Sequence, residues 1–232
     1  KVNIKSKKPM FYDPANVTLT YAYNETNQHD AETEENLIKQ ERAAVNYSYS
    51  FNNEPWEPFS KSKALSKPAF KIIKDFNLNI LPTNISFNTD LNRQFSKIKL
   101  RDYGNFASVG DEIAGLTFSK DFMWNRQFDI KFDLTKSLHF GLQTAMNSNI
   151  EEPYFTPEIG KEYYEEWRDS VMSSIRKLGT PYAYQQVFNA SWTLPINKIP
   201  LFDWITANAS YNSTYSWNRS ARVENVSVGN VA

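Results

Sequence analysis

Apolar and polar side chains alternate along most of this chain. Alternation with a period of two residues is typical of β-strands whose two faces meet different surroundings. Eight segments carry the pattern, and we expect a strand in each of residues 17–24, 45–52, 76–80, 85–92, 128–135, 138–147, 187–194 and 205–218. Several are long enough to cross a bilayer, which takes about 9–11 residues of tilted strand. The pattern therefore predicts an all-β fold, an antiparallel transmembrane β-barrel segment of about eight strands.

The two faces of these expected strands differ in chemistry. One face carries mainly Asn, Ser and Thr, the other is rich in Tyr, Phe and Trp, and charges concentrate between the strands. The wet face of a soluble sandwich usually mixes charged residues with Thr, so a lipid-facing band with aromatics fits better. We expect lumen-facing side chains at Asn77, Asn79, Asn88, Asp90, Asp129, Lys131, Asp133, Gln143, Asn189, Asn208, Ser210 and Asn212. We expect lipid-facing side chains at Val45, Tyr47, Phe87, Phe128, Ile130, Phe132, Phe140, Leu142, Ala209 and Tyr211.

The connections between these strands are predicted to alternate in length. This would place short turns at one rim of the barrel and long, charged loops at the other. The short ones are residues 82–84, 136–137 and 195–200, and the long ones are 53–73, 93–116 and 148–183. The acidic segment 25–43 falls on the short-turn side, and we interpret it as a helical or irregular insertion. Trp204 falls on the polar side of its expected strand unless a bulge intervenes.

One helix is predicted inside the long loop 148–183. Thr156 can cap it, Pro157 suits its first turn, and Gly179 with Pro181 ends it. An apolar stripe recurs every four residues at Ile159, Tyr163, Trp167, Val171 and Ile175. The stripe must pack either on the chain's own strands, at the barrel mouth, or on a partner. If the stripe packs on a partner, Tyr163, Trp167 and Val171 are the partner-binding residues.

Composition excludes several other classes. The chain has 26 basic and 26 acidic residues in 232, so nothing favours nucleic acid as a partner. It has no Cys and two His, which leaves no disulfide framework and no three-His metal site, and we expect no cofactor. The adjacent acids Glu34-Glu35, Glu151-Glu152 and Glu165-Glu166 are interpreted as solvated charges, and His139 as an isolated histidine. We therefore expect no enzyme, and we expect Asp129, Lys131 and Asp133 to form an ion-pair ladder with neighbouring strands.

Three stretches resemble the SprA/Sov family. They are residues 76–87 (FNLNILPTNISF) followed by 90–93 (DLNR), residues 16–21 (NVTLTY) and residues 55–59 (PWEPF), and the likeness runs over residues 9–220. The family is the large outer-membrane translocon of the type IX secretion system, associated with gliding motility in Bacteroidetes. The resemblance implies a passive conduit for folded cargo proteins that carry a C-terminal secretion signal. It also implies a smaller PorV-type barrel and a periplasmic plug protein as partners, in a bacterial outer membrane.

Two features of the chain ends favour an internal segment of a larger barrel, with residues 1–232 forming part of one barrel wall. Residues 1–15 contain no signal peptide, and residues 224–232 lack a terminal aromatic strand. Two other functions stay open at this point. One is an outer-membrane porin or nutrient transporter, and the other is a soluble β-sandwich that binds carbohydrate with its aromatic side chains.

Overall fold

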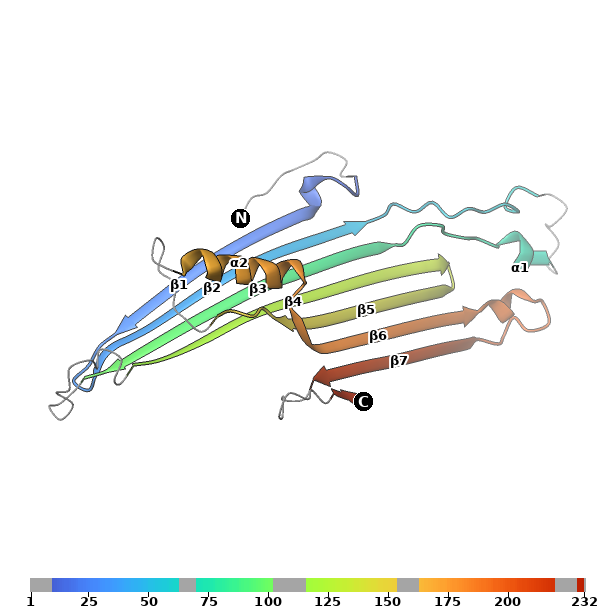
Figure 1. The fold of residues 1–232 in the computed structure, drawn as a ribbon. Coiled ribbons are helices and arrows are strands. Elements are labelled where there is room, and N and C mark those ends of the chain that lie inside the picture. Colours follow the sequence, from blue (N-terminus) through green and yellow to red (C-terminus); the bar gives the residue numbers. More distant parts are fainter. Residues whose placement is uncertain (1–9, 63–69, 102–115, 154–162, 220–228, 232) are drawn as a thin grey trace.

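The computed structural model describes residues 10–62, 70–101, 116–153, 163–219 and 229–231. All strands lie in one antiparallel sheet whose neighbours in space are neighbours in sequence (Figure 1). The strands are β1 (Val17–Gln28), β2 (Thr33–Ser50), β3 (Asn84–Leu100), β4 (Leu116–Thr135), β5 (Leu138–Asn149), β6 (Thr180–Leu194), β7 (Ala207–Arg219) and β8 (Gly229–Val231). The helices are η1 (Pro14–Asn16), α1 (Lys71–Lys74), α2 (Tyr164–Arg176) and η3 (Pro195–Lys198). The predicted all-β, antiparallel class is confirmed.

The sheet is open in the part of the chain that the structure describes. There β1 pairs with β2 alone, and β7 pairs with β6 and with the three-residue β8. Because successive strands alternate in direction, β1 and β7 run the same way. We call the two ends of the sheet the α1 end, with the β4–β5 turn, and the α2 end, with the β1–β2 turn.

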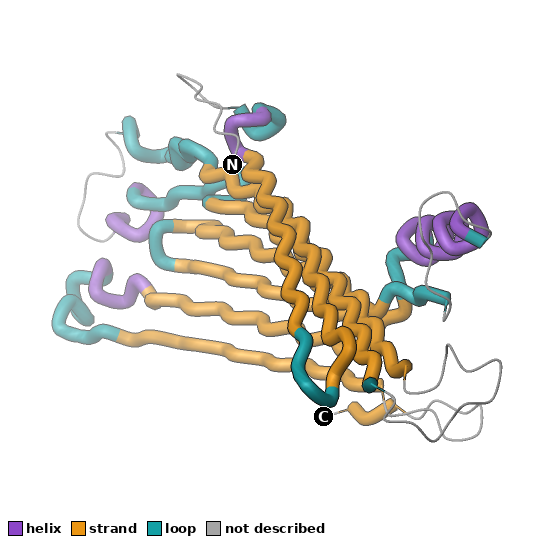
Figure 2. Tube along the Cα trace, turned by 90° about the vertical axis from the view of Figure 1, so that its left-hand side faces the viewer, coloured by secondary structure: helices purple, strands orange, loops and turns teal. Residues whose placement is uncertain are grey.

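The sheet is a single layer with a very small core. Among the described residues, the buried apolar side chains are Ala44, Phe95, Ile150 and Val171. Figure 2 shows α2 standing on one side of the sheet near one end of the strands, while the strands extend well beyond it. Most strand side chains on both faces therefore remain at least partly accessible.

The acidic segment 25–43 is strand, which corrects the expected insertion. β1 continues to Gln28 and β2 begins at Thr33, so the segment forms a long hairpin. Its turn is held by the Asp30 carboxylate, which accepts hydrogen bonds from the backbone N–H groups of Glu32 (2.9 Å) and Thr33 (2.6 Å). Charged side chains broke the apolar alternation here, although they pair across strands, as Lys97 and Glu35 do at 2.8 Å.

The strand expected at residues 76–80 is wrong. The described residues of the connection 51–83 contain no strand, and Trp56 and Leu78 form an isolated bridge there. Within it the Asn77 side chain donates to the carbonyl of Asp75 (2.8 Å) and accepts from the backbone N–H of Lys136 (2.7 Å). Such side-chain bonds to the backbone compete with a strand ladder. Asn77 and Asn79 therefore lie in a connection rather than on a strand facing a lumen.

The predicted sorting of short and long connections is also wrong. The long connection 51–83 lies at the α1 end beside the short turn at residues 136–137, and the short β1–β2 turn lies at the opposite end, with the long connections that follow β3 and β5. The expected loop 93–116 begins too early, since β3 continues to Leu100, and β4 begins at Leu116, the last residue of the expected loop. Trp204 precedes β7, so its misfit with the strand alternation disappears without a bulge.

The predicted loop helix is confirmed in its second half. α2 starts at Tyr164, and the preceding residue, Tyr163, has a left-handed backbone (φ 76°). Gly179 ends the helical segment at φ 69°, and a Cβ there would lie 2.9 Å from the carbonyl oxygen of Asn149. The expected start at Thr156 and Pro157, with Ile159, lies outside the described residues.

Candidate functional site

The register divides the sheet into an apolar and a polar face. Residues directly opposite each other in an antiparallel ladder point to the same face. One such row joins Val17, Tyr47, Phe87 and Phe128 across β1 to β4. A second row joins Phe132, Phe140, Ala190 and Tyr211 across β4 to β7. All ten residues predicted to face lipid lie on this one face, which we call the apolar face.

Part of the apolar face forms a continuous uncovered surface, which we call the apolar band. Its large members are Val17, Leu19, Tyr21, Val45, Tyr47, Tyr49, Ile85, Phe87, Leu91, Phe128, Ile130, Phe132, Phe140, Leu142, Met146, Phe188, Trp192, Tyr211 and Tyr215. Neighbouring rings touch, as in the contacts of Phe188 with Phe140 and Tyr211, both with ring centroids 6.2 Å apart. Tyr21 is 68% exposed and Tyr211 is 61% exposed. A water-soluble monomer rarely leaves such a large apolar surface uncovered.

The opposite face is polar along every long strand. It carries Asn88, Asp90, Asp129, Lys131, Asp133, Gln143, Asn189, Asn208, Ser210 and Asn212, the residues predicted to face a lumen apart from Asn77 and Asn79. Its neighbours in the rows are again mainly amides and hydroxyls. Small uncharged polar groups thus line this face, with few charges among them.

The charges on the polar face form separate pairs rather than the expected ladder. Asp90 pairs with Arg42 at 2.5 Å, and Asp133 pairs with the Nδ1 atom of His139 at 2.6 Å. Within the described part of the chain, Asp129 and Lys131 have no ion-pair partner, since their opposite residues are uncharged. The predicted ion-pair ladder is absent there because the residues opposite Asp129 and Lys131 on the neighbouring strands are Ser, Gln, Asn and Gly.

The Asp133–His139 pair was missed from the sequence, although a signal was available. The two residues lie directly opposite each other because only Lys136 and Ser137 separate β4 from β5. Thr83 adds a hydrogen bond to the same carboxylate at 2.8 Å. Among the described residues, no three His, Asp or Glu side chains lie close enough together to hold a metal ion.

At the α2 end the apolar face changes character. Here it carries Glu41, Arg93 and Lys120, and the segment 150–153 with α2 lies over it. The backbone N–H of Ile150 donates to the carbonyl of Phe122 (2.8 Å), which starts this segment along the edge of β4. Loop and helix thus cover the charges of Arg93 and Lys120, while the pair of Glu25 and Lys39 on the same face stays exposed.

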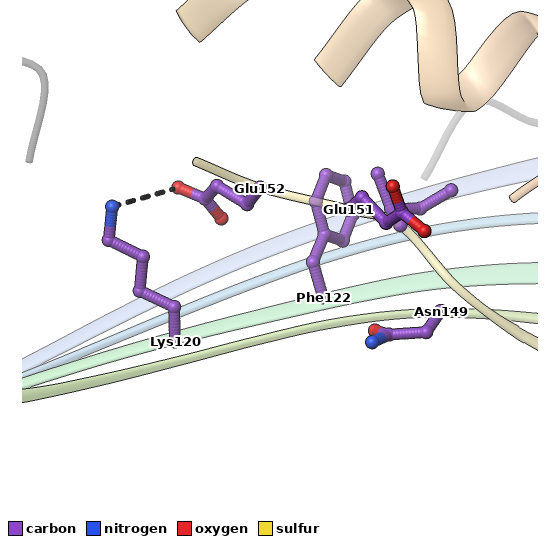
Figure 3. Close-up of a pocket in the computed structure, with 6 residues that line it drawn as sticks. Lys120, Phe122, Asn149, Glu151 and Glu152 are labelled. Carbon is purple, nitrogen blue, oxygen red and sulfur yellow. Dashed lines mark ion pairs between the residues drawn. The ribbon is translucent and has the colours of Figure 1, made fainter. Parts of the chain in front are cut away.

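Glu152 connects the helix to the sheet. Its carboxylate, only 4% exposed, accepts two hydrogen bonds from the Arg93 guanidinium (2.6 and 3.1 Å) and one from the indole Nε1 of Trp167 (2.9 Å). The Arg93 guanidinium also lies over the Trp167 ring, 5.3 Å from its centroid. The Lys120 ammonium approaches the same carboxylate to 3.8 Å across a hollow of about 240 Å³ (Figure 3). We call Glu152, Arg93, Lys120 and Trp167 the clamp.

The electrostatics of the clamp keep Glu152 ionised. Burial on its own raises the pKa of a carboxyl group, because the charged form loses hydration. At Glu152 the hydrogen bonds and positive charge of Arg93 outweigh burial, with Trp167 and Lys120 adding to them, and the pKa is lowered below its ordinary value. The carboxylate oxygens are occupied by these donors, so the group holds elements together rather than exchanging protons with a substrate.

The helix stripe contacts the chain's own sheet. Val171 is buried, and Trp167 is held in the clamp, while Tyr163 is exposed. This arrangement supports the interpretation in which the helix packs on its own strands. The clamp itself was not predicted from the sequence, since Arg93 and Glu152 are 59 residues apart and neither shares a motif with the other.

Arg126 marks the border between the apolar band and the covered region. Its guanidinium donates to the carbonyl of Leu178, just beyond α2 (2.9 Å), and to the hydroxyl of Ser148 (2.5 Å), and it stacks over Trp124. Its charge is thereby drawn away from the band towards the helix, as expected for a basic side chain that snorkels.

Across the described segments, no helix has the length and apolar character needed to span a membrane. A scan against protein-family models and a search of curated proteins each returned no match to this chain.

Proposed function

We propose that this chain forms part of the wall of a bacterial outer-membrane β-barrel that conducts proteins. The observation that carries the proposal is the single-layered antiparallel sheet, with an uncovered apolar band on one face and amides and hydroxyls on the other. A soluble sandwich would bury its apolar face against a second sheet. A barrel wall instead buries that face in lipid and solvates the other, and it needs no second layer.

The height of the apolar band fits a bilayer. On β7 it extends over nine residues, from Ala209 to Trp217. Nine residues of strand span about 27 Å, or about 21 Å along the axis of a barrel whose strands tilt by about 40°. The lipid-facing band of outer-membrane barrels is about 25 Å tall. The charges at Glu41, Arg93 and Glu152 then lie just outside the hydrocarbon region.

The polar face supports a wide conduit for proteins. Amide and hydroxyl groups hydrogen-bond water readily and bind a passing protein surface weakly, because they offer neither apolar area nor strong charge. The ion pair with Arg42 neutralises the charge of Asp90, one of the acids on this face. The resemblance of residues 76–93 to the SprA/Sov family points to folded cargo with a C-terminal secretion signal. On this proposal a PorV-type barrel and a periplasmic plug are the expected partners.

An open sheet with an odd number of long strands fits a wall segment better than a complete barrel. β1 and β7 run the same way, so they cannot close an antiparallel barrel against each other. β8 follows as a three-residue strand antiparallel to β7. Further strands would continue the wall on the free edge of β1 and beyond β8.

The proposal is tested by the width of the pore. The protein is extracted from outer membranes in detergent, reconstituted into planar bilayers, and its conductance is measured with polyethylene glycols of increasing size. A protein-conducting channel admits polymers with the radius of a small folded protein, whereas a porin or nutrient transporter excludes them. A chain that stays in the aqueous fraction without detergent, or a pore closed to all but small solutes, would contradict the proposal.

A further inference from the structure

A hollow lies at the α1 end of the sheet. It measures about 460 Å³ and is bounded by α1, the β4–β5 turn and η3. One wall is apolar and consists of Ile72, Phe76, Leu138, Trp192 and Pro195. A second, polar hollow of about 340 Å³ adjoins it and shares Asp75, Asn77, Lys136 and Lys198 with it. We call the two together the rim hollow.

The apolar wall of the rim hollow continues the apolar band. Leu138 and Trp192 lie directly opposite each other on the apolar face, and Ala209 follows Trp192 in the same row. Beyond them, Phe76 and Ile72 project from the connection before β3 and are more than a third exposed. An apolar chain lying along the band would therefore reach the hollow without crossing a polar surface.

The polar wall carries an excess of positive charge. Lys74, Lys136 and Lys198 line it together with the carboxylates of Glu57 and Asp75. Lys136 pairs with Glu57 at 2.6 Å, and Lys198 pairs with Asp75 at 3.0 Å. Lys74 has no ion-pair partner among the described residues.

The hollow is formed before any ligand arrives. Asn77, which is buried, donates to the carbonyl of Asp75 and accepts from the backbone N–H of Lys136, and so fixes two parts of the polar wall. The hydrogen bond from Lys198 lowers the pKa of Asp75, which keeps that carboxylate ionised and Lys198 in place. A ligand therefore finds its cationic and apolar walls already in position.

We propose that the rim hollow binds one anionic phospholipid. Its phosphate would contact Lys74, Lys136 and Lys198, and the start of an acyl chain would lie against Phe76, Ile72 and Trp192. The two walls match the two parts of this molecule, and their boundary falls at the end of the apolar band. The inference rests on the proposed function, because it takes the band as the lipid-facing surface.

The test measures lipids that remain bound to the purified chain by native mass spectrometry. The protein is incubated in neutral detergent with phosphatidylglycerol, and separately with phosphatidylcholine. We expect retention of phosphatidylglycerol and about a fivefold weaker binding in Lys74→Gln, since a lysine near an anionic lipid contributes about 1 kcal/mol. Lys61→Gln, an exposed lysine of the same connection that does not line the hollow, is the matched control and should bind as wild type.

The apolar wall of the rim hollow is tested with a second pair of variants, one inside the hollow and one outside it. Phe76→Ser removes a ring from the hollow, whereas Ile80→Ser changes a residue of the same connection that is 78% exposed and outside the hollow. We expect loss of phosphatidylglycerol retention in the first variant and none in the second. Equal retention of both lipids, or equal binding by all four variants, would overturn the inference. Displacement of phosphatidylglycerol by inorganic phosphate alone would overturn it too, by assigning the site to a free anion.

A control experiment distinguishes failure of the lipid site from failure of the proposed barrel wall. Carbonate-washed membranes containing the wild-type chain are assayed first. A chain released by the wash contradicts the barrel wall itself. A chain that stays embedded but lacks selectivity for phosphatidylglycerol contradicts the lipid site alone.

Discussion

The apolar face consists of two regions that share a register but have opposite chemistry. Under α2 it contains Arg93 and Lys120, and their charges meet the buried carboxylate of Glu152. In the apolar band the same strands carry rings and aliphatic groups, and no described helix covers them. The charges of Arg93 and Lys120 thus have both a partner and a cover, which the chain itself supplies. The band lacks such a cover, and on the proposed function lipid surrounds it.

The largest expected effect comes from removing the partner in the covered region. Glu152→Gln leaves Lys120 without its carboxylate and leaves Arg93 only its longer pair with Glu41 at 3.4 Å, and breaking a buried ion pair costs about 3–5 kcal/mol. We expect α2 to detach, which hydrogen exchange of its backbone amides would record as faster exchange. Glu166→Gln, on the exposed side of α2, is the matched control and should leave exchange unchanged. Equal exchange in both variants would mean that the clamp does not hold the helix.

The second effect concerns charge placed in the uncovered region. We expect Ala209→Arg and Tyr211→Arg to impair insertion, because an Arg facing the middle of a bilayer costs about 2–4 kcal/mol. Asn208→Arg and Ser210→Arg, one residue away on the polar face, should insert normally. The measurement is the fraction of each variant that resists extraction by carbonate. Equal insertion of all four would remove the distinction between the two faces.

The third effect is a dependence of the clamp on pH. The pKa of Glu152 is lowered in the folded protein, so its contribution to docking is fully present above the ordinary pKa of a glutamate, about 4.3. As the pH falls below that value the contribution decreases, and it is lost as the pH passes through the lowered pKa of the folded state. Hydrogen exchange of α2 measured from neutral pH to pH 3 should therefore show opening in wild type. In Glu152→Gln the exchange, corrected for its intrinsic pH dependence, should stay constant over this range.

The smallest effect is expected for exposed pairs. Glu34→Gln removes the pair with Lys99, 2.8 Å apart at the surface of the β2–β3 ladder. Such pairs contribute about 0–1 kcal/mol, because water screens them and two long side chains lose freedom. Thermal unfolding in detergent should shift by at most a few degrees. A loss as large as that of Glu152→Gln would mean that burial does not distinguish the two pairs.

The parts of the fold that were predictable are those with uniform chemistry on each face. Between Phe128 and Met146 the alternation is unbroken, and both strands and the intervening turn lie where the pattern placed them. The part of the β1–β2 hairpin in residues 25–43 was missed because charged residues that pair across strands replaced apolar residues, and alternation records only hydrophobicity. The strand expected at Phe76 was wrong because the alternation there continues through a segment whose side chains bond to its own backbone.

The contacts of the clamp could not be predicted from the sequence, for a different reason. Glu152 looked like a solvated acid beside Glu151, and nothing local distinguishes the two. Only the fold brings Arg93, 59 residues earlier, to the same carboxylate. Trp167 was singled out as part of an apolar stripe, and its indole N–H, rather than its ring alone, turned out to link the helix to the sheet.

The sequential order of the strands sets how the sheet can assemble. Each strand pairs only with its neighbours in the chain, so every hairpin can form as soon as its own connection closes. The β4–β5 connection has two residues and the β2–β3 connection has 33, a difference that adds about 2.5 kcal/mol of loop-closure entropy to the second. We therefore expect β4 and β5 to pair first and β2 to join β3 late. A cysteine placed on each of β2 and β3 would cross-link more slowly during refolding than a matched pair on β4 and β5.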